Sequence, residues 1–303
     1  MILSCRPEYK IQTRTDKAMK NRGGEAMFQD KGTVPLSCKT EEPSPCPSAL
    51  QTGEKGNYIM WLSVLFFLLS IIPSVLVIVW IMKRKKEDLE YKKSCKSALI
   101  RGLICVLPIL ALSAVLYIVS RILKATALQS VNILVYKAIY TFIVLAFAEE
   151  FVKFFSFKGL LKKRAINYSW ADVVAFMVII GTAFGLVEDI PYAIGATPVI
   201  MLVRGFTMGH LGYGFMMGWF YGKKLYTGKK RYGVLAFVLP FLLHGLYDFS
   251  LTPELLEWND NIAFLGVALA ATDLVLLALM IRFFIKARKK EHYNIDLSVM
   301  FKA

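Results

Sequence analysis

Charged residues are scarce in this chain of 303 residues: they make up 19% of the sequence, against about a quarter in typical soluble domains. Hydrophobic residues make up 56%, and the mean hydropathy is +0.51. Several apolar runs exceed the ~20 residues that a helix needs to cross the ~30 Å hydrocarbon layer of a bilayer. A soluble globule would interrupt such runs with polar faces. The composition therefore excludes a soluble domain and predicts an integral membrane protein.

The sequence also lacks the common metal-binding signatures. It has five cysteines but no CxxC pair, and only three histidines, none in an HExxH motif. Cys38 and Cys46 could close a small disulfide in an extracytoplasmic tail, although an odd cysteine count without regular spacing is more often typical of unpaired thiols. No histidine lies near the amino-terminal cysteines to complete a zinc ribbon.

A net charge of +15 could indicate nucleic-acid binding, but the distribution of the basic residues argues against it. They gather in short loops between apolar runs, which is the pattern of positive-inside topology and of contact with anionic lipid headgroups. We therefore expect the lipid bilayer as a partner and no nucleic acid.

Three regions are expected along the chain. Residues 1–58 are polar and rich in Pro, Ser and Glu towards their end, so they predict a disordered tail, although translation could also begin at an internal Met such as Met60. No apolar core of a signal peptide appears in them. Residues 59–290 predict a transmembrane bundle, and residues 291–303 a cytosolic tail.

The bundle is expected to be all-α, with about seven transmembrane helices. The apolar segments are 59–82, 98–120, 131–157, 171–194, 198–222, 232–250 and 262–285. The loops after the first, third, fifth and seventh segments are strongly basic, which places the amino terminus outside and the carboxyl terminus in the cytosol. Glycines at four-residue spacing, including Gly181 with Gly185 and Gly214 with Gly218, predict that the fourth and fifth segments pack closely at the centre.

Ionisable residues recur inside the apolar segments, where each costs ~2.5 to 3.5 kcal/mol and marks a functional site by default. The set is Glu149, Glu150, Lys153, Glu188, Asp189, Arg204, His210, His244 and Asp248. Helical spacing predicts that Glu149 pairs with Lys153, which leaves Glu150 the freer carboxylate or a second partner, and that Asp248 orients the ring of His244.

The expected depth of these residues in the membrane groups them by a second argument, which does not use their spacing within one helix. Glu149, His210 and His244 each stand thirteen residues from a basic residue at the expected cytosolic interface, which places them in one layer ~20 Å from it. Single polar residues often only join helices. This reading is favoured for Arg204 and Asp189, whose side chains are expected to reach towards the outer interface.

Four motifs in order resemble the PrsW family of intramembrane proteases, which is distantly similar to the CAAX prenyl endopeptidases. They are AEEFVKFF at 148–155, FGLVEDIPY at 184–192, the segment 204–222 with His210, and HGLYD at 244–248. The resemblance covers roughly residues 135–250. Asp189 departs from it, because the family commonly has Asn there.

The resemblance implies an endopeptidase in a bacterial plasma membrane that cuts membrane-anchored proteins, in the founding case an anti-sigma factor. Glu149, alone or together with Glu150, would activate water as the general base. His210, His244 and Glu188 would hold zinc or, without metal, the oxyanion. Asp248 would orient His244, with Lys153 and Asp189 in support.

Two other readings remain open. Buried Glu, His and Asp residues also carry protons in transporters and channels, although the halves of this chain show no internal repeat. A catalytically silent membrane scaffold is the third reading. The sequence sets neither the substrate nor the oligomeric state.

Overall fold

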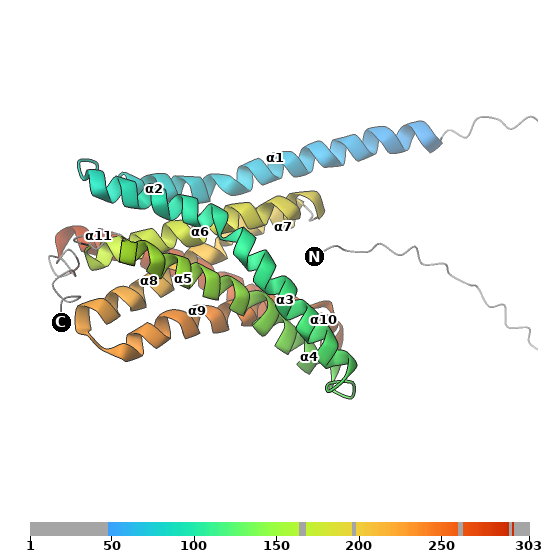
Figure 1. Ribbon diagram of the computed structural model, residues 1–303. Coiled ribbons are helices and arrows are strands. Elements are labelled where there is room, and N and C mark those ends of the chain that lie inside the picture. The colour runs from blue at the N-terminus through green and yellow to red at the C-terminus, as the bar shows by residue number, and fades with distance from the viewer. Residues whose placement is uncertain (1–47, 164–167, 196–197, 260–262, 291–292, 294–303) are drawn as a thin grey trace, which may run out of the picture. The chain divides into compact units, whose positions relative to one another are not determined.

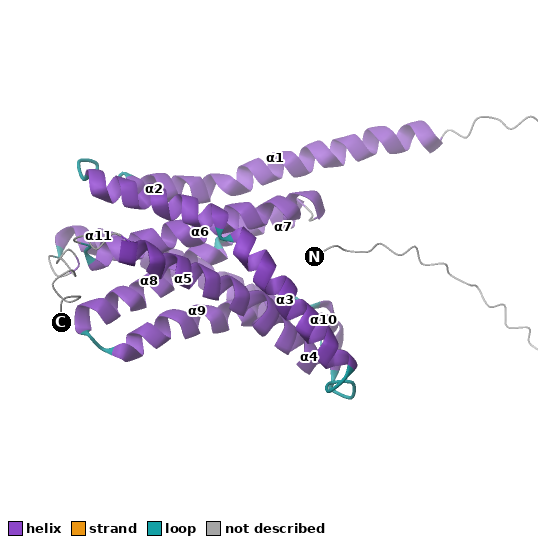
Figure 2. Cartoon of the chain, viewed as in Figure 1, coloured by secondary structure: helices purple, strands orange, loops and turns teal. Residues whose placement is uncertain are grey.

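The computed structural model describes residues 48–163, 168–195, 198–259, 263–290 and 293, and these residues form helices and no strands. Figure 1 labels the helices, and Figure 2 shows the short loops that join them. The elements are α1 (Ser48–Met82), α2 (Leu89–Ile104), α3 (Val106–Ala125), α4 (Ile133–Ile139), the π-helix η1 (Tyr140–Phe147), α5 (Ala148–Lys163), α6 (Trp170–Gly195), α7 (Pro198–Thr207), α8 (Gly209–Thr227), α9 (Lys230–Ser250), α10 (Pro253–Trp258) and α11 (Ala263–Lys289). The predicted all-α class is confirmed.

Five helical stretches in the described residues are long and apolar enough to cross a membrane, judged by length and composition. They are Val64–Met82, Leu89–Ala125, Trp170–Tyr192, Lys230–Ser250 and Phe264–Lys289. They coincide with the first, second, fourth, sixth and seventh expected segments. The third expected segment falls on α4, η1 and α5, and the fifth on α7 and α8.

The helix α1 begins at Ser48, so residues 48–58, expected in the polar tail, are already helical. A formed helix extends at little cost once its apolar part has fixed the first turns. Residues 1–47, 291–292 and 294–303, which hold the rest of the two expected tails and the cysteines Cys5, Cys38 and Cys46, lie outside the described residues.

Local chemistry explains where several helices begin. Asp88 caps α2 by accepting from the Tyr91 amide at 2.8 Å. Before α6, the Ser169 hydroxyl accepts from the Asp172 amide at 3.2 Å, and the Asp172 carboxylate accepts from the Ser169 amide at 3.1 Å. This reciprocal pair is a capping box. Asp172 also binds Arg84 and Lys85 from the turn after α1, which ties that turn to the start of α6.

The second expected segment is divided at Cys105, between α2 and α3. Pro108 has no amide hydrogen, so it cannot donate to the carbonyl of Ile104 four residues earlier. The loss of that bond accounts for the interruption at the end of α2.

Helix α6 is the centre of the fold, as predicted from its glycines. Two-thirds of its apolar span, 67%, is buried inside the protein, against 17–28% for the other four spans. A Cβ added at Gly214 of α8 would lie 2.8 Å from the Met177 carbonyl, and one at Gly218 would lie 2.9 Å from Val174 Cα. These contacts require glycine, because they let the backbones of α6 and α8 meet.

The continuous helix expected over 198–222 is wrong. Met208 has φ 47° and ψ 47°, in the left-handed region, and separates α7 from α8. A non-glycine residue rarely adopts this conformation, so nothing local in the sequence predicts it. The break changes the chain direction two residues before His210 and thereby sets where that side chain points.

Candidate active site

The π-helix η1 leads directly into the first turn of α5, which carries Glu149 and Glu150, and Lys153 follows one turn later. Lys153 is 1% exposed, and its Nζ donates to Glu150 Oε1 at 2.6 Å while lying 3.6 Å from Glu149 Oε2. The predicted Glu149–Lys153 ion pair is present, and of the two roles left open for Glu150 the structure has that of a second and closer partner of Lys153. Glu150 is the tightly paired carboxylate, and Oε2 of Glu149 is buried without a hydrogen-bond partner.

The helix α9 brings His244 to the same cluster. Its Nδ1 lies 2.9 Å from Glu150 Oε1, and a carboxylate only accepts, so Nδ1 carries a hydrogen and donates it to Glu150. Asp248 Oδ2 is 3.4 Å from Nε2. The Asp248 contact predicted from the four-residue spacing is present, but Glu150 is the nearer carboxylate and fixes the opposite ring nitrogen. Tyr213 of α8 stacks on the His244 ring with centroids 5.0 Å apart.

The first turn of α8 supplies His210. Its Nδ1 accepts a hydrogen bond, whereas Nδ1 of His244 donates one. Nδ1 of His210 lies 3.0 Å from Lys153 Nζ, and an ammonium only donates, so Nδ1 accepts. Its Nε2 forms a hydrogen bond with Glu188 of α6. The ring of Phe184 meets His210 edge-on at 4.9 Å and lies 4.6 Å from Lys153 Nζ. This apolar ring shields both contacts from solvent.

Two glycines on α6 make room for His210. A Cβ at Gly181 would lie 2.3 Å from the His210 carbonyl oxygen, and one at Gly185 would lie 3.2 Å from His210 Cδ2. The sequence favoured ordinary helix packing for this pair. In the structure these two glycines make room for the backbone carbonyl and the ring of His210.

The cluster converges on Glu149. Its Oε2 lies 3.9 Å from Nε2 of His210 and 3.9 Å from Nε2 of His244. Ligand atoms of Glu149, Glu150, His210 and His244 all lie within 4.8 Å of one another, a spacing that could hold a metal ion. The depth argument is thereby supported, because residues of three helices predicted to share one layer meet at one point.

Arg204 belongs to this site, although the sequence favoured a side chain that reaches towards the outer interface. Its guanidinium lies 3.2 Å from Glu188 Oε2 and donates from Nε to Asp189 Oδ1 at 2.9 Å. Asp189 is 9% exposed, and Arg204 Cζ lies 3.8 Å from the centroid of Tyr192. The general rule for buried charges in membranes identifies Arg204, whereas its nearness to the end of an apolar run pointed the other way.

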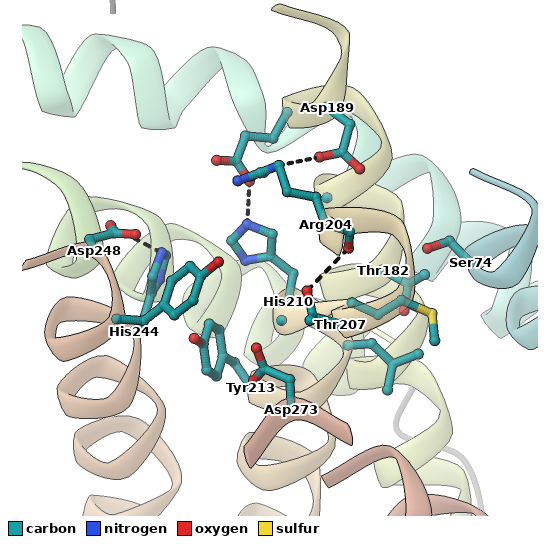
Figure 3. Close-up of a pocket in the computed structure, with 16 residues that line it drawn as sticks. Ser74, Thr182, Asp189, Arg204, Thr207, His210, Tyr213, His244, Asp248 and Asp273 are labelled. Atoms are coloured by element: carbon teal, nitrogen blue, oxygen red, sulfur yellow. Dashed lines mark hydrogen bonds and ion pairs between the residues drawn. The ribbon is translucent and has the colours of Figure 1, made fainter. Parts of the chain in front are cut away.

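A small cavity of about 50 Å³ adjoins the cluster (Figure 3). Its lining includes Glu188, Arg204, His210, His244 and Asp248, together with Ser74, Thr182, Tyr213 and Asp273. Asp273 of α11 was not among the predicted site residues. The signal for it was present, because it is an acidic residue within an apolar segment.

The comparisons with known proteins point to one family. The model of the PrsW family intramembrane metalloprotease matches residues 97–282, beyond the expected 135–250 at both ends. Protease PrsW of Oceanobacillus iheyensis is 33% identical over 117 residues, which cover 37% of this chain and 54% of that protein. Protease PrsW of Clostridioides difficile is 26% identical over 199 residues, or 62% of this chain and 79% of that protein.

The chain thus spans about half the length of the first of these relatives and more of the second. No solved structure matches it. The family match covers well over half of the chain and includes every residue of the cluster, from Glu149 to Asp248. The chain belongs to the PrsW family of intramembrane metalloproteases.

Proposed function

We propose that this protein is an intramembrane endopeptidase that cleaves membrane-anchored proteins. The observation that carries the proposal is the buried Oε2 of Glu149, which has no hydrogen-bond partner and faces Nε2 of both His210 and His244 at 3.9 Å. A buried carboxylate oxygen without a hydrogen bond is costly, so its retention next to two imidazoles fits a group reserved for a reacting molecule.

In the proposed reaction Glu149 accepts a proton from water as the water oxygen adds to the carbonyl carbon of the scissile peptide bond. The same carboxyl group then gives that proton to the amine nitrogen as the C–N bond breaks. Lys153 and Glu150 hold the two imidazoles in place through His210 Nδ1 and His244 Nδ1. Ring nitrogens of His210 and His244 face the same point, where charge develops on the carbonyl oxygen.

The residues also fit a zinc ion. Two imidazoles and a carboxylate with one open position form a common catalytic zinc set, and ligand atoms of Glu149, His210 and His244 lie within 4.8 Å of one another. His210 and His244 would hold the ion through Nε2, with Glu188 or Glu149 as the carboxylate. When bound, zinc would polarise the carbonyl and favour ionisation of the attacking water.

Zinc on His210 Nε2 would require the ring hydrogen on Nδ1, where Lys153 Nζ now lies at 3.0 Å. The ammonium would then withdraw from this nitrogen and remain with Glu150, 2.6 Å away. Lys153 would thus bind both Glu150 and His210 without zinc, and Glu150 alone with zinc bound.

We further propose seven membrane crossings, with the amino terminus outside and the carboxyl terminus in the cytosol. The five long apolar helices would be joined by two composite crossings, one formed by α4, η1 and α5 and one by α7 and α8. The basic loops support this orientation. The expected localisation is a bacterial plasma membrane, and the expected substrate class is a regulatory protein of the anti-sigma-factor type.

One observation favours a second candidate function, a proton-coupled transporter. Helices broken beside a buried ionisable cluster are typical of transporters, and α7 and α8 are separated at Met208, two residues before His210. Proton flux through the protein in liposomes, absent in Glu149→Gln, would support this alternative.

The test of the peptidase compares membranes from cells that express the wild type or Glu149→Gln at equal levels. Mass spectrometry searches both for new protein termini near transmembrane segments. Glu257→Gln, which changes an exposed glutamate of α10 in the same way, is the matched control. We expect new termini with wild type and Glu257→Gln only. Identical termini in all three samples would contradict the proposal.

A further inference from the structure

Two polar atoms of residues that line the cavity are buried without a hydrogen-bond partner. They are Oγ1 of Thr182 on α6 and Oδ1 of Asp273 on α11. Their residues are only 3% and 2% exposed. Figure 3 shows Thr182 on the opposite side of His210 from His244. A buried polar group without a partner destabilises the fold, and more strongly when it is charged.

Asp273 lies against the first turn of α8. A Cβ at Gly209 would be 3.2 Å from its Oδ2, and one at Gly212 would be 3.6 Å from its Oδ1. Across the described residues, no donor lies within hydrogen-bond distance of its buried Oδ1. Because Gly209 and Gly212 have no Cβ, the fold leaves space for the Asp273 side chain, but it supplies no hydrogen-bond partner for Oδ1.

The cavity extends from Ser74, Thr182 and Asp273 to the Glu and His cluster, where it is lined by Glu188, His210 and His244. Its lining includes Ser74, Thr182, Tyr213 and Asp273 as well as His210. A site holds an ordered water when it offers ~10 to 15 Å³ for the water centre and two to four polar partners. A volume of about 50 Å³ meets this condition for a few waters, but it has no room for a peptide segment.

We propose that Ser74, Thr182 and Asp273 form a water pocket, which holds ordered water inside the membrane and delivers it to Glu149. Hydrolysis needs water in a layer from which lipid excludes it, and waters bound at Asp273 would satisfy the unpaired oxygens found there. The role in delivery rests on the proposed peptidase function. The hydration of the pocket does not.

The test uses two serines one turn apart on α1. Ser74 lines the cavity, whereas Ser70 packs against Gly205 of α7 and donates its hydroxyl to the Phe67 carbonyl at 2.7 Å. Both are buried, at 9% and 2% exposed. Ser74→Cys and Ser70→Cys therefore place the same thiol on the same helix, inside and outside the proposed pocket.

Silver ion is the probe, because it is small, hydrated and reacts with the thiolate form, which a dry apolar site suppresses. After exposure of the protein in membranes, unfolding and maleimide labelling with peptide mass spectrometry report the blocked fraction at each cysteine separately. The buried native Cys95 and Cys105 serve as internal references. We expect Ser74→Cys to be blocked at least about tenfold faster than Ser70→Cys.

Asp273→Leu on the Ser74→Cys background should slow the blocking, because it removes the polar group that retains water. Asp273→Asn, which keeps a polar side chain, should leave the blocking nearly as fast. Equal rates for the two single cysteines, or no effect of Asp273→Leu, would overturn the water pocket. If Asp273→Leu does not fold, the comparison of the two single cysteines decides.

No substrate enters this experiment, so its outcome is separate from that of the peptidase test. Fast blocking of Ser74→Cys without any wild-type-dependent termini would keep the water pocket and reject the peptidase. Slow blocking of Ser74→Cys together with wild-type-dependent termini would reject the water pocket and keep the peptidase.

Discussion

Nζ of Lys153 lies 3.0 Å from Nδ1 of His210, although 57 residues separate them in the chain. The same Nζ donates to Glu150 at 2.6 Å. One fully buried ammonium thus joins α5 to α8 and determines which nitrogen of His210 carries the hydrogen. The catalytic chemistry proposed for Glu149 depends on this fixed neighbour.

Lys153→Met should destabilise the protein by about 3 to 5 kcal/mol, because it leaves Glu150 as a buried charge without its cation. Lys153→Met with Glu150→Gln should recover much of that loss, since a neutral amide no longer needs the ammonium. The stability of both variants is measured by thermal unfolding in detergent, with gel filtration to monitor the loss of the folded protein. A double variant no more stable than the single one would contradict the assigned pair.

The two neighbouring glutamates should respond differently to the same change. Glu149→Gln should lower cleavage by about 10² to 10⁴-fold, the usual contribution of a general base, with unchanged or higher thermal stability because Glu149 Oε2 has no hydrogen-bond partner. Glu150→Gln should lower thermal stability, because Glu150 binds both Lys153 and His244. Equal stabilities of the two variants would show that the pairing is not as described.

Gly185→Ala should lower cleavage while the helices stay packed. The new Cβ would lie 3.2 Å from His210 Cδ2, so the ring must shift relative to Glu188 and Glu149. Gly218→Ala is the control on the α6–α8 contact, because its Cβ would meet Val174 Cα at 2.9 Å and no cluster residue. We expect Gly218→Ala to lose stability and keep its activity per folded molecule, measured by cleavage after gel filtration.

If zinc occupies the cluster, the purified protein should contain about one zinc per chain. His210→Ala with His244→Ala should lose it, because both imidazoles are removed from the ligand set. Elemental analysis of the wild type and the double variant measures this, with Glu257→Gln as a folded control. Metal-free protein with full cleavage activity would instead favour the mechanism that uses Glu149 alone.

The sequence by itself determined the class of the protein. Long apolar runs can only be solvated by lipid, and in lipid a helix satisfies its own backbone, so the all-α fold and the positions of the five long spans follow from composition. The spacing of Glu149, His210 and His244 from basic loops also gave their common depth, because the helical rise is constant. The glycines of α6 and α8 indicated which helices meet.

Only the tertiary structure decided how these residues pair. Glu149 and Glu150 stand next to each other, and helical spacing offers Lys153 to both, so the choice of Glu150 depends on His244 arriving from α9. The break at Met208 and the place of Arg204 likewise depend on packing against other helices, which no local pattern encodes. A sequence shows which charges are buried, but which of them are paired is set by neighbours that are distant in the chain.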